Sequence, residues 1–127
     1  MISRLRKRLA HDESGFTLIE LLVVIIILGV LLAIAIPSYL KFKDRANNAA
    51  AQANIRAAVP AVEAYNADNA GYSGMTLSLL QSNYDQGVKN ITVVSASATT
   101  YCVSSTIGTS SYYKNGPGGD IITTICT

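Results

Sequence analysis

The chain has 127 residues and a formal net charge of +2, and half of its residues are hydrophobic. A chain of this length is expected to form one small domain. It contains no tryptophan, and His11 is its single histidine, which excludes a histidine-rich metal site. The basic excess falls within residues 1–15, and the rest of the chain has six basic and six acidic side chains. Nucleic-acid binding is therefore not indicated.

The amino end combines a basic leader with a long apolar run. The leader, residues 1–15, contains Arg4, Arg6, Lys7 and Arg8. From Phe16 to Ile36 only Thr17 and Glu20 are polar, and as a helix this run is roughly 30 Å long, enough to cross the hydrocarbon core of a bilayer. The sequence therefore predicts a membrane-spanning helix.

Glu20 is unexpected in such a run, because a carboxylate at the centre of a membrane helix costs on the order of 2.5–3.5 kcal/mol, and less near an end. The positive end of a helix dipole beginning near Phe16 offers partial compensation. A cut between Gly15 and Phe16 would add a free α-amino group four residues from the carboxylate.

The motif Gly15-Phe16-Thr17-Leu18-Ile19-Glu20-Leu21 after a short basic leader resembles the prepilin signature of type IV pilins and type II secretion pseudopilins. The resemblance covers about 25 residues and includes Gly29 and Pro37. It implies that a prepilin peptidase cuts after Gly15 and methylates the new amine of Phe16. It also implies that Glu20 pairs with such an amine while the helices pack into a filament.

The resemblance implies a structural subunit of a type IV pilus, with roles in adhesion, twitching motility or DNA uptake. The alternative within the family is a type II secretion pseudopilin or a minor pilin. The expected partners are other subunits, the peptidase and the pilus assembly machinery of the inner membrane. Before assembly the chain is expected in the cytoplasmic membrane with a cytoplasmic amino end, and afterwards in an extracellular pilus.

Two other interpretations of the amino end remain open. Ala33-Ile34-Ala35 resembles a signal-peptidase site, although the apolar run of Leu21–Ile36 is long for a secretory signal and Glu20 has no purpose there. A single-pass anchor that is never processed is the second alternative.

The helical pattern continues after the membrane run. We expect residues 16–37 and 38–68 to be two halves of one helix, with Gly29, Pro37 and Pro60 as its points of flexibility or bending. The second half has small residues on one face, at Ala46, Ala50, Ala53, Ala57, Ala61 and Ala64, and larger ones nearly opposite, at Ile55, Val59 and Val62. Two apolar faces predict two partners, the chain's own sheet and the helices of neighbouring subunits.

Residues 69–127 are expected to form a globular head. Gly71-Tyr72-Ser73-Gly74 ends the long helix, and Thr76 can cap a short helix through Leu80 or Ser82. The predicted antiparallel strands are Ile91–Ser95, Thr99–Ser104, Ser110–Lys114 and Ile121–Cys126, with a turn at 115–119. The fold class is therefore α+β, a pilin-like long helix packed on a sheet of three or four strands.

The head offers little for catalysis. The sequence has no catalytic set and no sign of a cofactor or metal site, so an enzyme is not expected, and Glu63 and Asp68 are interpreted as solvated. Of the adjacent Tyr112 and Tyr113, one is expected to pack and the other to be exposed. Cys102 and Cys126 are expected to form a disulfide in an exported head, with two reduced thiols as the alternative.

Overall fold

The computed structural model describes residues 15–126, so the basic leader, apart from Gly15, lies outside the described residues. The chain divides into two compact units, Met1–Lys41 and Phe42–Thr127, which are described separately below. The elements follow in the order α2 (Leu18–Asn69), α3 (Leu77–Asn83), β1 (Thr92–Ala96), β2 (Tyr101–Ile107), β3 (Ser110–Gly116) and β4 (Ile121–Ile122). The predicted α+β class, with a long helix and an antiparallel sheet, is confirmed.

The first unit consists of the apolar part of α2. This helix is the one element among the described residues that is long and apolar enough to cross a membrane. Among the described residues its large side chains are exposed, with exposed fractions from 48% at Val23 to 88% at Leu18. The helix is unbroken at Gly29, Pro37 and Pro60, so their proposed flexibility stays a prediction.

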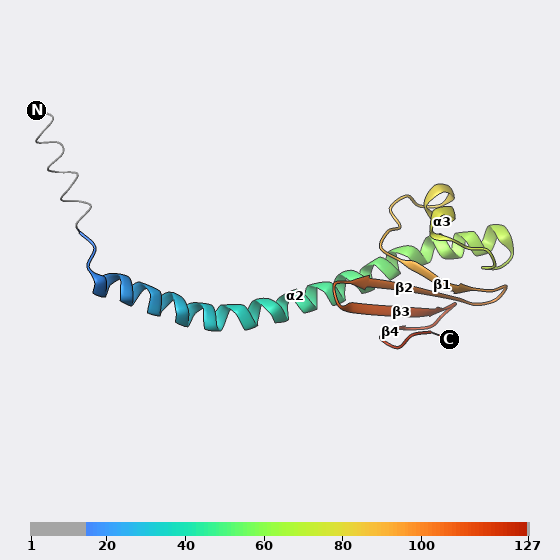
Figure 1. Ribbon diagram of the computed structural model, residues 1–127. Helices are drawn as coiled ribbons and strands as arrows, with labels where there is room; N and C mark the ends of the chain where they lie inside the picture. Colours follow the sequence, from blue (N-terminus) through green and yellow to red (C-terminus); the bar gives the residue numbers. More distant parts are fainter. Residues whose placement is uncertain (1–14, 127) are drawn as a thin grey trace, which may run out of the picture. The chain divides into compact units, whose positions relative to one another are not determined.

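In the second unit the four strands lie side by side in the order β1-β2-β3-β4, all antiparallel (Figure 1). The later part of α2 packs against this sheet through one face, whose buried residues are Ala51, Ile55, Ala58, Ala61, Val62 and Tyr65. Ala61 thus belongs to the buried face, whereas the sequence pattern placed it among the opposite alanines. Ala53 and Ala57, from the same alanine series, are exposed.

Glycine and a helix cap shape the connection from α2 to the sheet. Gly71 has a φ of +150°, and a Cβ there would lie 2.7 Å from the carbonyl oxygen of Ala98. Only glycine allows the backbone to come this close, and with Ala70 at a φ of +54° it turns the chain away from α2, which ends at Asn69 beside the predicted break. Thr76 accepts a hydrogen bond from the amide of Leu79 and begins α3, as expected of an N-cap.

The predicted strands exist, but β1 is shifted by one residue, β2 begins two residues later than predicted, and the carboxyl-terminal boundaries of β2, β3 and β4 were wrong. β2 continues past Ser104 to Ile107, because Ser105 is buried with its hydroxyl donating to the carbonyl of Asn90 at 2.6 Å and accepting from Asn54 at 3.3 Å. Hydrogen bonding thus makes a buried polar residue acceptable in the strand. β4 has only two residues, since only Ile121 and Ile122 pair with β3.

The boundary error in β3 concerns Gly116, which was predicted to lie in a turn. It is instead the last residue of β3 and is paired with Tyr101. A Cβ on Gly116 would lie 2.0 Å from the ring of Tyr101, so the tyrosine ring occupies the space that the glycine leaves free.

Tyr112 and Tyr113 are both half-buried, so the prediction that one of them is exposed was wrong. Tyr112 packs against the core, and Tyr113 stands opposite Ile122 of β4. The short fourth strand thus gives the second tyrosine a neighbour that the sequence pattern did not anticipate.

Glu63 is also not simply solvated, which corrects a further expectation. The hydroxyl of Tyr72, a residue only 2% exposed, donates to both oxygens of the Glu63 carboxylate at 3.2 and 3.1 Å. Burial, followed by this hydrogen bond and the nearby negative charge, raises the pKa of Tyr72. Asp68 is exposed but likewise accepts a bond, from Tyr84 at 3.0 Å.

Cys102 of β2 and Cys126 form a disulfide, with Cα atoms 6.1 Å apart and a sequence separation of 24. By loop-closure entropy, a cross-link of this span stabilises a fold by roughly 3–4 kcal/mol. The bond ties the carboxyl-terminal segment, of which only two residues pair in the sheet, to a buried central strand.

Removal of the hydroxyl should affect the free energy of unfolding differently at Tyr101 and at Tyr72. The hydroxyl of Tyr101 is buried without a hydrogen-bond partner, so we expect Tyr101→Phe to leave the free energy of unfolding unchanged or to raise it. Tyr72→Phe removes the bond to Glu63 and should lower this free energy by about 1–3 kcal/mol. Denaturant unfolding of the full chain in detergent micelles measures both, and a larger loss for Tyr101→Phe would contradict the assigned roles.

Alkaline pH should destabilise the head. Burial, followed by the negative charge of Glu63 and the neighbouring Tyr72, raises the pKa of Tyr101 to about 12. The unfolded value is about 10, so the folded state holds this proton more tightly, and stability present below pH 10 should be lost as the pH rises toward 12. Unfolding measured from pH 8 to 12 should therefore show a falling stability with a shallower slope in Tyr101→Phe. Equal slopes for the two proteins would rule out Tyr101 as the cause.

Candidate functional site

The start of α2 is organised by a reciprocal pair of hydrogen bonds between Thr17 and Glu20. The amide of Thr17 donates to Oε2 of Glu20 at 3.1 Å, and the amide of Glu20 donates to Oγ1 of Thr17 at 3.3 Å. This arrangement is a capping box, which satisfies two amide groups that a helix start otherwise leaves without partners. This cap was not predicted from the sequence, although the spacing Thr17-Leu18-Ile19-Glu20 carries its signal.

The carboxylate of Glu20 keeps one oxygen available. Within residues 15–126 its Oε1 atom takes part in no hydrogen bond, while Oε2 is used by the cap. The side chain lies in the first turn of α2, where the positive end of the helix dipole favours a negative charge. Glu20 can therefore cap its own helix and accept a second donor at the same time.

The surface around this carboxylate is apolar and uncovered. Phe16, at 77% exposed, and Ile19, at 67%, are the large neighbours. They contribute to a shallow hollow whose lining residues are Gly15, Phe16, Ile19, Glu20, Leu21, Val23 and Val24. One charged group within an apolar surface is an arrangement that selects a partner with both an apolar body and a cation.

The predicted cleavage point lies just outside the helix. Gly15 and Phe16 are exposed and precede the first helical residue, Leu18. The peptide bond between them is thus neither helical nor covered by another described part of the chain. This geometry permits a peptidase to bind the bond without unwinding α2.

The remaining predicted residues are not brought together at this site. Gly29, Pro37 and Pro60 are spread along α2, and apart from the local helix backbone no described atom lies within 4 Å of a Cβ added at Gly29. Cys102 and Cys126 pair with one another in the head.

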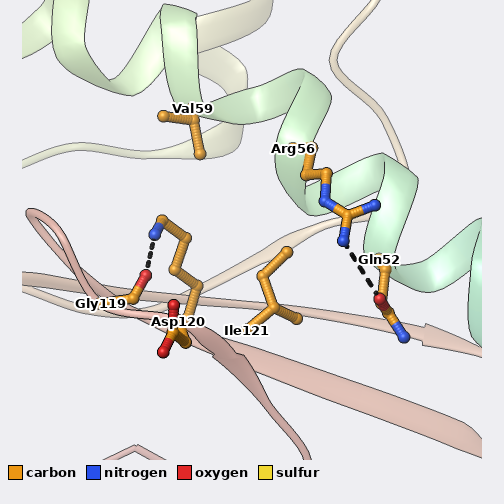
Figure 2. A pocket seen from close by; sticks show the side chains of 7 residues that line it. Gln52, Arg56, Val59, Gly119, Asp120 and Ile121 are labelled. Atoms are coloured by element: carbon orange, nitrogen blue, oxygen red, sulfur yellow. Dashed lines mark hydrogen bonds between the residues drawn. The ribbon is translucent and has the colours of Figure 1, made fainter.

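The head has a groove of about 570 Å³ beside the later part of α2. Figure 2 shows it between the helix residues Gln52, Arg56 and Val59 and the segment of Gly119, Asp120 and Ile121. Its cations already have partners inside the groove, because Arg56 donates to Gln52 at 3.3 Å and Lys114 donates to the carbonyl of Gly119. Among the described residues that line the groove there is no Ser, Thr or Cys, and the single carboxylate is that of Asp120.

The described residues also show no metal centre. Across residues 15–126, no group of three or more His, Cys, Asp or Glu side chains is placed to hold an ion. Among the sites described, the start of α2 is the one that combines an available carboxylate oxygen with an exposed apolar surface.

Comparison with known proteins agrees with this geometry. Residues 11–36 match the family described as "Prokaryotic N-terminal methylation motif". The chain is 41% identical over 95 residues to the type IV wide pilus major component PilA4 of Thermus thermophilus, covering 73% of this chain and 72% of that protein.

Two further relatives match over a shorter length. The type II secretion system core protein G of Pseudomonas aeruginosa is 42% identical over 62 residues, 49% of this chain and 44% of its own. The type IV major pilin protein PilA of Myxococcus xanthus is 42% identical over 61 residues, 48% of this chain and 28% of its own. The chain thus covers less than half of these two relatives.

The apolar helix and the pilin relatives indicate that the protein is anchored in a membrane before it assembles. Pilins and pseudopilins are structural subunits of filaments rather than enzymes, which agrees with the expected absence of catalysis. The extent of the match to PilA4, together with the methylation motif, shows that this chain belongs to the type IV pilin superfamily.

Proposed function

We propose that the chain is the structural subunit of a type IV pilus, cut by a prepilin peptidase after Gly15 and methylated on the amine of Phe16. The mature subunits assemble through packing of residues 16–37, with residues 38–68 completing the helix and residues 69–127 forming the outer head. The observation that carries the proposal is the available oxygen of Glu20 within an exposed apolar surface.

The chemistry of that carboxylate favours an α-amino group as its partner. When subunits cover the apolar surface, a carboxylate without a cation would be left in a medium of low dielectric constant, at a cost of several kcal/mol. Cleavage at Gly15 creates a cation at Phe16, whose side chain is as apolar as the surface it meets. Pairing of Glu20 with this amine, from its own or a neighbouring subunit, would therefore fix the register of packing.

The pilus interpretation is favoured over a pseudopilin by the extent of the matches. The 95-residue match to PilA4 is too long to fit within residues 1–69, so it extends into the part of the chain that carries α3 and the sheet. The 62-residue match to core protein G is short enough to lie within the helical part. A pseudopilin or minor pilin is the second candidate.

The proposed partners follow from this role. The peptidase and the pilus assembly machinery would meet the subunit in the cytoplasmic membrane, with its amino end on the cytoplasmic side. After assembly the subunit would be part of an extracellular filament, acting in adhesion, twitching motility or DNA uptake.

The first test is the mature amino end. Intact-mass analysis of the protein from sheared filaments should show a chain that begins at Phe16 and carries one added methyl group. The protein should also dominate these filaments if it is the major pilin. A chain that begins at Met1 would indicate an unprocessed anchor, and a trace component beside a secretion complex would indicate the second candidate.

The second test separates the charge of Glu20 from its role in the capping box. Glu20→Gln keeps a side-chain acceptor for the cap but removes the charge, whereas Glu20→Ala removes both. If the carboxylate pairs with an amine, both variants should be cleaved normally and should lose filaments to a similar degree. Pilus yield after shearing, relative to the parent chain, measures the effect.

Asp120→Asn is the matched control, because it removes one exposed negative charge from the head, far along the chain from the apolar run, and should leave the pilus yield unchanged. Filaments at normal yield from Glu20→Gln, together with loss in Glu20→Ala, would reduce Glu20 to a helix cap and reject the pairing.

A further inference from the structure

A short segment of α2 after the apolar run combines aromatic and basic side chains that are exposed among residues 15–126. Tyr39 is 64% exposed and Phe42 is 71% exposed, although both carry large apolar rings. Exposed cations alternate with them, at Lys41, Lys43 and Arg45. Asp44 is the single acidic residue of the segment, which leaves a net charge of +2 over residues 39–45.

The cations lie on two opposite sides of the helix rather than along one face. At 3.6 residues per turn, each step rotates the side chain by about 100°, so Lys41 and Arg45 share one side while Lys43 projects from nearly the opposite side. A helix that lies flat on a surface needs its cations on one face. Cations on opposite sides instead suit a helix that passes through a charged surface and contacts it on more than one side.

The position of these cations along α2 agrees with the headgroup surface of a membrane. The last residue of the apolar run is Ile36, and the helix is continuous from there to Arg45. With a rise of about 1.5 Å per residue, the cations follow Ile36 by roughly 8–13 Å of helix. Headgroups begin where the hydrocarbon ends, and tyrosine and other amphipathic rings are enriched at that level.

We propose that residues 39–45 form a collar that binds the phosphate groups of anionic phospholipids while the subunit is held in the membrane. Lys41, Lys43 and Arg45 pair with the headgroups, and Tyr39 and Phe42 insert at the boundary with the acyl chains. The collar fixes the depth of the helix and must give up its lipids when the subunit leaves for the filament. This inference depends on the membrane stage of the proposed function.

The absence of tryptophan from the chain permits a local test. Phe42→Trp places a single fluorescent reporter in the collar of the full chain, which is reconstituted into phosphatidylcholine vesicles. Trace amounts of nitroxide-labelled phosphatidylglycerol or nitroxide-labelled phosphatidylcholine then quench the reporter according to their local concentration. The expected result is stronger quenching by the anionic lipid, weakening as salt is added.

Charge variants with a matched control decide the assignment. Lys41→Gln with Lys43→Gln, made in the reporter chain, should lower the preference for the anionic lipid by up to about fivefold per charge removed. Arg56→Gln with Lys89→Gln removes the same charge from exposed positions outside the collar and should retain the preference.

Equal quenching by the two lipids in the reporter chain, or the same loss in both double variants, would overturn the collar. Vesicle flotation separates this result from failure of the proposed function. A chain that floats with the vesicles but shows no lipid preference contradicts the collar alone, whereas a chain that does not float contradicts the membrane stage as well.

Discussion

The structure depends on an apolar helical surface that the chain itself cannot cover. The large apolar side chains from Phe16 to Ile36 are exposed in the part of the chain that the structure describes, and their contact with water would carry a large free-energy cost. Lipid and the helices of other subunits are the two environments that remove this cost. Burial of this surface in a membrane or in an assembly therefore stabilises the chain, and under the proposed function the subunit would pass from the first environment to the second.

In the head, by contrast with the apolar helix, polar side chains take part in the packing of the core. The carboxylate of Glu63 receives the hydroxyl of Tyr72, and the Tyr72 ring lies 4.8 Å from that of Tyr101. The Tyr101 ring in turn fills the space above Gly116. A helix, a loop and two strands are thus joined through one small cluster, which the aliphatic core around Ile55 and Val62 surrounds.

Much of this could be predicted from the sequence, and the failures share one cause. Local periodicity and turn residues predict the long helix, the Thr76 cap and the order of the strands, because these signals lie in residues that are close together in the sequence. The interaction of Glu63 with Tyr72 and the strand position of Gly116 depend on residues that folding brings together from separate elements. The Thr17–Glu20 cap is the exception. Its signal, a threonine followed three residues later by a glutamate, is local, but the two residues were interpreted only as part of the prepilin motif.

That cap also has a consequence for what the removal of a leader does to the helix. The hydrogen bonds at the start of α2 are supplied by Thr17 and Glu20, both of which lie beyond the Gly15–Phe16 bond. Hydrolysis of that bond would therefore break no hydrogen bond of the helix and would require no refolding. The helix from Leu18 onward would be the same before and after the cut, so for the mature part of the chain the reaction would change only the charge and covalent state of the end that the subunit presents to its neighbours.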